Sequence, residues 1–280
     1  MKKRVAAAVL TALVACLAFA LCGCTEPYNP DAAKKAPTVD ASALKEEGVL
    51  HVGVNASSYP LAGQANGKMS GLDVDVAAAI GQELGLRVEF VDVGEDGVKA
   101  LGGDEVDMVM SVESDAAKGK CWVSPGYAPS GVSLFSMDES AALPKKGGDA
   151  VIAAQTSSLS AWLVSRQFGE GALKAEDDLK TVFKQLADGE VPYVAADAVV
   201  GAYVMNSEGI AGHIVGVMQV PDEYCIGIAD GNDVLQAAVS DALTQLEGNG
   251  NGMMSIIMMK WFGTPLSLSD VPQTDGAKNA

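Results

Sequence analysis

Residues 48–93 read GVLHVGVNASSYPLAGQANGKMSGLDVDVAAAIGQELGLRVEFVDV, and this stretch decides the fold. Apolar residues alternate with polar or small ones at its start, which is the spacing of a β-strand. A turn-rich loop follows, and then Val76, Ile80 and Leu84 recur every four residues, as on one face of a helix. Residues 86–90 alternate again. The stretch therefore predicts a strand, a helix and a second strand.

The long first connection of this unit favours a parallel sheet. Asp73 or Asp75 is expected to accept the free amide hydrogens at the start of the helix, and Gly85 to end it. In parallel sheets ligands bind beyond the carboxyl ends of the strands. The loop over residues 55–71 is therefore the first candidate for a binding site.

The rest of the chain continues the alternation of strands and helices, which predicts an α/β fold. The helix over 157–168 is expected to place Leu159, Trp162 and Leu163 on one face. Asp177 and Asp197 each precede a predicted helix and are candidate N-caps. The further predicted strands are 106–110, 150–154, 193–196 and 224–229, and the further helices are 179–186, 198–205, 232–247 and 253–262.

Composition excludes several classes of function. The 280 residues are 49% hydrophobic and 20% charged, as in an ordinary globular protein, and the net charge is −17. Phosphate binding needs clustered Lys and Arg, so the acidic balance argues against a nucleic-acid partner. It also argues against direct electrostatic attraction to an anionic membrane surface.

The first residues have the features of an export signal. Lys2, Lys3 and Arg4 precede an apolar run over residues 5–21. The alternative is a transmembrane anchor, since the run is near the lower length limit for a span. Leu-Cys-Gly-Cys at 21–24 resembles a bacterial lipobox, which favours a lipoprotein signal at 1–23 and lipidation of Cys24. Residues 24–47 are then a tether.

Several motifs resemble one known family. These are G-x-L-x-V-G-V from Gly48, Tyr59-Pro60, and G-K-x-x-G-L-D-V-D from Gly67. Later in the chain YCIGIA from Tyr224 and KWFG from Lys260 occur in the same order. Together they resemble the amino-acid-type (family 3) extracytoplasmic solute-binding proteins of ABC transporters, over about residues 48–263.

The resemblance implies a two-lobe periplasmic-binding-protein-like (type II) fold, in which the chain crosses a two-strand hinge twice and a ligand binds between the lobes. Lobe 1 would comprise residues 48–131 and 221–264, and lobe 2 residues 132–220. Residues 265–280 contain two prolines and are expected to form a flexible tail.

The resemblance also suggests ligand-binding residues in three loops and after one strand. Tyr59 would stack on the ligand, with packing in a turn as the alternative. Asp197 would pair with an α-ammonium group, a strong contact when charge-assisted, or cap a helix, or both. Ser157 is equally explained as a helix cap. The full set of candidates is Asn55, Tyr59, Ser111, Glu113, Ser114, Lys118, Thr156, Ser157, Ser158 and Asp197.

Two departures from the family pattern bear on the ligand. Members of the family usually carry an arginine in a T-x-x-R pattern, and its planar guanidinium binds the ligand carboxylate. Here residues 114–120 read SDAAKGK, and the position of that arginine falls near Ala117. Lys118 is close but presents a point charge instead of a planar fork. Residues 94–97 read GEDG where a second stacking aromatic is expected. These changes favour a cationic or amine-bearing ligand.

Catalytic motifs are absent from the sequence. No GxSxG, P-loop GK[ST], HExxH or GxGxxG run occurs, and no CxxC pair suggests zinc. His51 interrupts a strand and is expected to pack instead of acting as a base. We therefore expect a binding protein without cofactor or metal. Two alternatives stay open: a dehydratase-like enzyme on the same fold, with Glu113 as acid, and a sensory or partner-binding module that no longer transports.

The expected protein is an extracytoplasmic, lipid-anchored monomer that passes a small polar ligand to an ABC permease. In that oxidising compartment Cys121 and Cys225 are the pair of cysteines left after export and lipidation. In the resembling fold their segments are neighbouring strands of one lobe, which suggests a disulfide. The alternative is two separate buried thiols.

Overall fold

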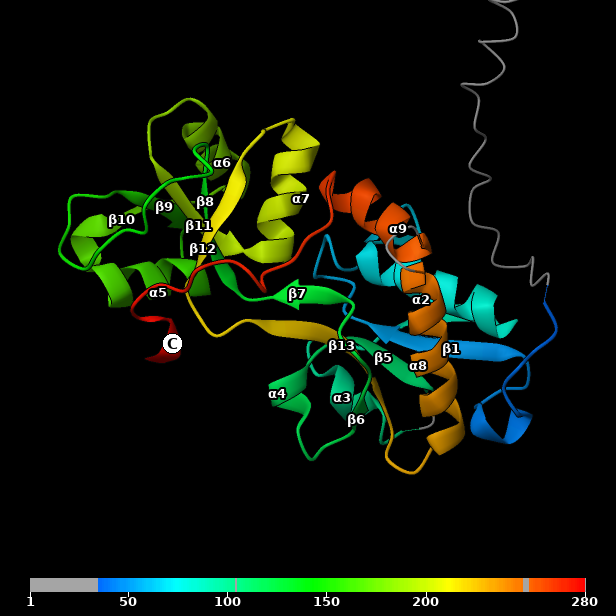
Figure 1. Ribbon diagram of the computed structural model, residues 1–280. Helices are drawn as coiled ribbons and strands as arrows, with labels where there is room; N and C mark the ends of the chain where they lie inside the picture. The colour runs from blue at the N-terminus through cyan, green and yellow to red at the C-terminus, as the bar shows by residue number, and fades with distance from the viewer. Residues whose placement is uncertain (1–34, 104, 249–251, 280) are drawn as a thin grey trace, which may run out of the picture. The chain divides into compact units, whose positions relative to one another are not determined.

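The computed structural model describes residues 35–103, 105–248 and 252–279, and two β-sheets organise them (Figure 1). The strands of the first sheet follow the order β4-β1-β5-β13-β6, with β7 also paired to β13. Their bounds are β1 Val49–Val54, β4 Arg87–Asp92, β5 Met108–Glu113, β6 Trp122–Val123, β7 Ala128–Ser130 and β13 Asp222–Ile228. Strand β1 pairs in parallel with β4 and β5, which confirms the predicted parallel sheet. Strand β13 is antiparallel to β5.

The second sheet has the order β10-β9-β11-β8-β12. Its strands are β8 Val132–Ser136, β9 Ile152–Gln155, β10 Leu173–Glu176, β11 Tyr193–Asp197 and β12 His213–Val217. Strands β9, β10 and β11 are parallel, and β8 is antiparallel to β11 and β12. The chain passes between the sheets twice, through Gly131 from β7 to β8 and through residues 218–221 from β12 to β13. These two crossings are the two-strand hinge.

Helices pack against the first sheet through two apolar clusters, of which the larger contains α2, α8 and α9. Val76, Ile80 and Leu84 of α2 are at most 4% exposed, as their spacing predicts. They share a cluster with Val239 of α8 and Phe262 of α9. The elements of this part are η1 Ala41–Ala43, β2 Gly63–Ala65, β3 Lys68–Ser70, α2 Leu72–Leu84, α3 Gly97–Ala100, α4 Ser114–Ala117, α8 Asp233–Glu247 and α9 Met253–Phe262.

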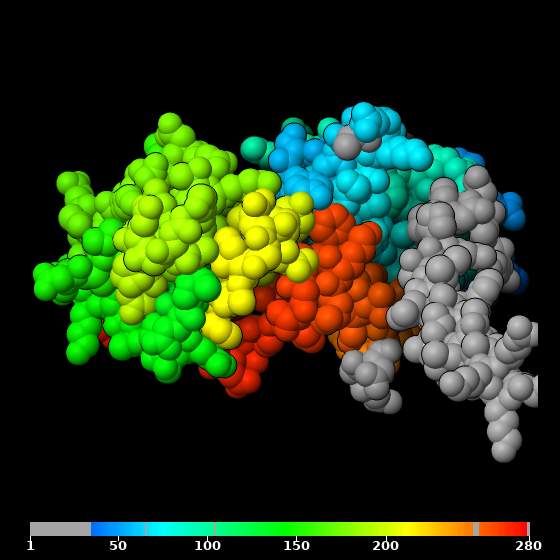
Figure 2. All heavy atoms as spheres, turned by 90° about the horizontal axis from the view of Figure 1, so that it is seen from above, coloured from blue at the N-terminus to red at the C-terminus, as the bar shows by residue number. Residues whose placement is uncertain are grey.

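The second sheet is packed by α5 Leu159–Phe168, η2 Glu170–Ala172, α6 Leu179–Ala187 and α7 Ala198–Glu208, and η4 Ala277–Asn279 ends the described chain. Helix α7 contacts α6 of its own lobe and α9 of the other, and Figure 2 shows α7 (yellow) against the orange-red α9 segment. The predicted apolar face of α5 is only partly buried. Leu163 is 1% exposed, but Leu159 is 58% and Trp162 52% exposed.

Two helix caps differ from the prediction by one residue. Ser158 caps α5 by accepting a hydrogen bond from the Ala161 amide, so Ser157 is not the cap. Asp178, and not Asp177, caps α6. In both cases the extended residue directly before the helix has the geometry to accept from the first turn.

The segment after α9 is packed against the second sheet, which corrects the expected flexible tail. The Val217 amide donates to the Pro272 carbonyl at 3.0 Å, and the Thr274 amide donates to the Val217 carbonyl at 2.9 Å. Leu268 and Ala277 are buried. Backbone pairing along β12 holds this segment despite its prolines.

The expected tether is likewise packed over the part that the structure describes. The Thr38 amide donates to the Leu84 carbonyl, and Val39 is buried in the core of the first lobe. The signal peptide at 1–23 and the lipidation site Cys24 lie outside the described residues. Among the described residues, no helix is both long and apolar enough to cross a membrane.

Candidate functional site

A cleft of about 410 Å³ lies between the two lobes, beyond the carboxyl ends of the parallel strands. This is the position that the strand order predicts. Lobe 1 contributes Ser58, Tyr59, Leu61, Glu113, Ser130 and Tyr224 to its lining, and lobe 2 contributes Gln155, Ser158, Leu159, Asp197 and Gln219 among others. The cleft therefore brings together Tyr59, Glu113, Ser158 and Asp197 from the predicted set.

Asp197 ends β11 and begins α7. Its Oδ1 accepts hydrogen bonds from the amides of Val199 and Val200 at 3.0 and 3.1 Å, and its Oδ2 accepts from the Gly131 amide at 3.4 Å. The carboxyl group is therefore a helix cap that also contacts the hinge. Burial raises the pKa of Asp197 to about 6, and the charge of Glu113 adds to this effect.

Glu113 ends β5, where it faces the same cleft. Its Oε1 accepts a hydrogen bond from the Ser130 hydroxyl at 2.7 Å. Tyr224 lies opposite Glu113 in the strand register, and burial raises its pKa well above the usual value. The charges of Asp197, Glu113 and Asp73 contribute to the same rise. The acidic groups of the site thus act on one another across a half-buried tyrosine.

Asp73 is not a helix cap, which corrects the prediction for the start of α2. The N-cap of α2 is Gly71, without a side-chain bond, and Asp73 is 1% exposed. Its Oδ2 accepts from the Ser111 hydroxyl at 2.6 Å and its Oδ1 from the Tyr127 hydroxyl at 2.7 Å. Burial raises the pKa of Asp73 to about 6, although both hydrogen bonds oppose the rise.

This triad fixes the end of β5. Ser111 has φ 54°, a left-handed conformation that is uncommon for a side-chain-bearing residue, and its amide donates to the Tyr127 hydroxyl at 2.9 Å. Sequence analysis missed Tyr127, because the contact joins residues far apart in the chain. Beside the triad is a second pocket of about 380 Å³, whose lining includes Asn55, Ser111, Glu113 and Lys120.

Tyr59 lines the cleft but also belongs to an aromatic cluster. Its ring lies edge-on to Tyr203 of α7, with centroids 5.2 Å apart, and to Trp261 of α9 at 5.9 Å. The Tyr203 hydroxyl donates to the Tyr59 hydroxyl at 3.3 Å. Burial and Tyr203 raise the pKa of Tyr59 to about 12. The ring remains 48% exposed, so part of its surface is accessible to a ligand.

Four predicted site residues do not line either pocket. The Ser114 hydroxyl donates to Asp222 at 2.5 Å instead. Lys118, Thr156 and Ser157 are also absent from both linings, and all three are exposed. The lysine at the second pocket is Lys120, two residues beyond the predicted one.

Cys121 and Cys225 are buried free thiols in the structure, which corrects the predicted disulfide. The register explains the difference. Cys225 lies opposite Val112 of β5, whereas Gly227 is the residue of β13 paired with β6 through Val123. Cys121 precedes β6, and its sulfur lies beside Gly227.

Comparison with known proteins identifies the family. Residues 50–264 match the bacterial extracellular solute-binding proteins, family 3. The chain belongs to this family. The L-cystine-binding protein TcyJ of Escherichia coli (strain K12) is 25% identical to it over 241 residues, which cover 80% of this chain and 86% of TcyJ.

Solved structures agree with the fold. A polar amino acid ABC uptake transporter substrate-binding protein from Streptococcus thermophilus matches with a TM-score of 0.69 and 18% identity, over 83% of this chain and 92% of that one. The L-cystine solute receptor of Neisseria gonorrhoeae matches with a TM-score of 0.63 and 20% identity, over 80% and 96%. These matches confirm the two-lobe solute-binding fold expected from the sequence.

Proposed function

We propose that this family 3 solute-binding protein captures a small polar ligand, amino-acid-like or amine-bearing, between its two lobes and delivers it to an ABC permease. The observation that carries the proposal is the cleft, whose lining combines Glu113 of lobe 1 with Asp197 of lobe 2. A ligand that contacts both lobes favours the arrangement in which both contact it. TcyJ is named for binding L-cystine, which supports a ligand with amino groups.

We also propose binding without turnover. In family 3 the cleft serves solute binding, and the acidic side chains found here are engaged in structural contacts. Asp197 caps α7, and Glu113 accepts from Ser130. The match to a family of solute-binding proteins supports a receptor over an enzyme.

A thermal-shift screen of the full-length protein, purified in detergent, tests the binding function. The panel comprises amino acids including cystine, polyamines and small organic acids. A ligand that binds only the folded state raises the melting temperature, and the stabilisation grows with the logarithm of its concentration over Kd. Hits are confirmed by calorimetry, and recovered ligands are analysed by mass spectrometry. A chemically changed ligand would support the enzyme alternative, and the absence of any hit would support the sensory one.

Attachment to the outer face of the cell membrane through a lipid on Cys24 completes the proposal. It rests on the Leu-Cys-Gly-Cys sequence at 21–24. Two acyl chains provide stable anchoring that a single chain does not. Cys24→Ala is expected to move the protein from the membrane fraction to the soluble fraction. Retention in the membrane fraction through an uncleaved N-terminus would contradict lipidation. We further propose that the protein acts as a monomer, which size-exclusion chromatography with light scattering tests.

A further inference from the structure

We propose that the ligand is an elongated organic cation with at least two amino groups, a diamine or polyamine, and that it needs no carboxylate. This inference rests on the proposed function of the cleft. Its basis is the distribution of charge over two adjoining pockets, the cleft between the lobes and the second pocket of lobe 1.

The lining of the cleft contains the carboxylates of Glu113 and Asp197 and neither Lys nor Arg. Of the three arginines in the chain, two are in the part that the structure describes. Arg87 pairs with Glu46 and Glu89, and the Arg166 guanidinium lies 4.8 Å from the centre of the Trp162 ring. Neither of them lines the cleft, so no guanidinium fork is there to receive a ligand carboxylate.

The two pockets adjoin one another. Ser58, Leu61, Glu113 and Tyr224 line both, so Glu113 is common to the two. The second pocket continues to Glu95 and Asp96, both exposed, in the position where the resemblance implies a stacking aromatic. Lys120 is the one cationic residue in the described lining of this pocket. Negative charge is therefore spread along the site instead of being gathered at one point.

Acidic groups spread over two adjoining pockets suit a ligand with more than one positive group. A single ammonium at Asp197 would leave the acids of the second pocket without a ligand contact. A second ammonium, separated from the first by a methylene chain, can reach them while the chain passes Leu61 and the Tyr224 ring. A cation beside Asp197 and Glu113 also relieves the repulsion that each carboxylate exerts on the other.

Titration calorimetry on the full-length protein tests the inference with ligands matched in length. The probes are 1,4-diaminobutane, spermidine, butylamine, arginine and cystine. We expect 1,4-diaminobutane or spermidine to bind at least about tenfold more tightly than butylamine, because the second amine gains contacts to charged groups. Arginine and cystine are expected to bind more weakly than the best amine.

Two variants separate the amine contacts from a carboxylate contact. The double variant Glu95→Gln/Asp96→Asn is expected to lower diamine affinity about tenfold and to leave butylamine affinity unchanged. Both substitutions preserve shape, and both residues are exposed, so folding is not at risk. Lys120→Gln is expected to increase diamine affinity, since it removes a like charge from the second pocket.

Each result decides between defined outcomes. If cystine or arginine binds at least about tenfold more tightly than every amine, and Lys120→Gln weakens that binding, the diamine inference is wrong while the solute-binding function stands. If the diamines bind no better than butylamine, the inference is also wrong. If no compound of the wider panel binds, the proposed solute-binding function fails together with the inference.

Discussion

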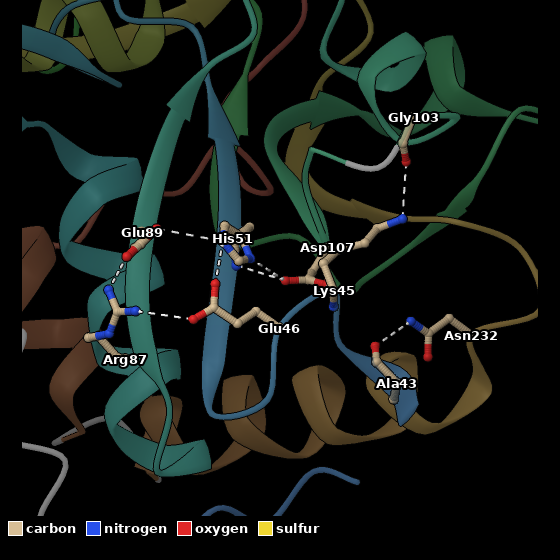
Figure 3. Close-up of polar contacts among 9 residues, drawn as sticks. All are labelled: Ala43, Lys45, Glu46, His51, Arg87, Glu89, Gly103, Asp107 and Asn232. Carbon is tan, nitrogen blue, oxygen red and sulfur yellow. Dashed lines mark hydrogen bonds and ion pairs between the residues drawn. The ribbon is translucent and has the colours of Figure 1, made fainter. Parts of the chain in front are cut away.

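Two groups of carboxylates at opposite ends of the first sheet differ in how their charge is compensated. Near the amino ends of the strands is the basal ion network, which comprises Glu46, His51, Arg87, Glu89 and Asp107 (Figure 3). At the carboxyl ends are the site carboxylates, which we define as Asp73 of the second pocket, Glu113 of both pockets, and Asp197, which faces them across the cleft from the end of β11 in the second sheet. In the basal network the chain itself supplies a cation, Arg87, which pairs with two of the three carboxylates.

His51 is central to the basal ion network. Its Nε2 lies 3.8 Å from Glu46 and 3.6 Å from Glu89, and its Nδ1 lies 3.4 Å from Asp107. Arg87 pairs with both glutamates from the neighbouring strand. His51 therefore packs among carboxylates, far from the cleft end of β1, as expected for a residue without a catalytic role.

The pKa directions differ in the same way. The hydrogen bond from Arg87 lowers the pKa of Glu89, whereas burial raises the pKa of Asp73 and of Asp197 to about 6. Both groups belong to one acidic protein, so overall acidity does not explain the contrast. The difference teaches that burial, and not a neighbouring cation, governs the pKa of Asp73 and Asp197 at the site, where a cationic ligand can compensate their charge.

Asp107→Ala breaks the basal ion network and is expected to have the largest effect. The Asp107 carboxylate accepts bonds from the amides of Lys45 and His51, each at 2.7 Å. Losing both is expected to lower the free energy of unfolding by about 3 kcal/mol, since each hydrogen bond to a charged group contributes about 1.5–3 kcal/mol. Chemical denaturation measures the change, with the exposed Glu170→Ala as control. A loss equal to the control would contradict a structural role for the network.

Asp197→Asn removes a carboxylate from the cleft, as Asp107→Ala removes one from the basal ion network. Ligand binding is expected to weaken by about 1.5–3 kcal/mol, the range for hydrogen bonds to charged groups. The free energy of unfolding should not fall, because Asn also caps helices and the buried charge is removed. Calorimetry and denaturation are measured on the same preparation. Unchanged affinity together with lowered stability would show that Asp197 only caps α7.

Ligand affinity should depend on pH through Asp197. Burial raises the pKa of this group to about 6, and a bound cation is expected to return it toward its ordinary value. Binding therefore requires loss of a proton below pH 6. The affinity should be about tenfold weaker at pH 5 than at pH 7 and constant above pH 7. An Asp197→Asn protein whose affinity showed the same pH dependence would rule out this assignment.

The stability of the ligand-free protein should change in the opposite direction. A carboxyl group with a raised pKa in the folded state binds its proton more tightly there than in the unfolded chain. Asp73 and Asp197 should therefore each add about 1 kcal/mol to the free energy of unfolding as the pH falls from 7 to 5. The lowered pKa of Glu89 has its effect only below its ordinary value, at lower pH. Denaturation of wild type and Asp197→Asn at both pH values isolates the Asp197 share.

Local patterns predicted most of the fold. The strand–helix–strand unit over 48–93 is present as β1, α2 and β4, because period and turn residues act within a few positions. Leu159 and Trp162 are exposed on the apolar face predicted for α5, because helical periodicity shows which residues share a face but not what covers that face. The packing of residues 266–279 depends on pairing with β12, which no local pattern shows.

Some of the residues that line the pockets could be predicted from their positions after strands, and others could not. Tyr59, Glu113 and Asp197 line the cleft because they follow strands whose carboxyl ends meet there. Lys118 is exposed and lines neither pocket, because a shift of one or two residues in a loop is enough to change which side chain reaches a pocket. The Asp73–Ser111–Tyr127 triad joins three distant segments. The predicted disulfide depends on the pairing of β13 with β6, whose register places the two cysteines out of step.

The smallest expected effect concerns the uncharged contact between the lobes, and it tests whether charge is what distinguishes the cleft. Tyr203→Phe removes the hydroxyl that donates to Tyr59 and keeps the ring contact at 5.2 Å. We expect the free energy of unfolding to fall by only about 0.5 kcal/mol, because the bond is long and Tyr59 is half exposed. Ligand affinity should change by less than about twofold, far below the effect of Asp197→Asn. Calorimetry on both variants under one buffer makes the comparison. If Tyr203→Phe weakened binding as much as Asp197→Asn, the hydroxyl contact between Tyr203 and Tyr59 would matter to ligand binding as much as the Asp197 carboxylate, and charge would not distinguish the cleft.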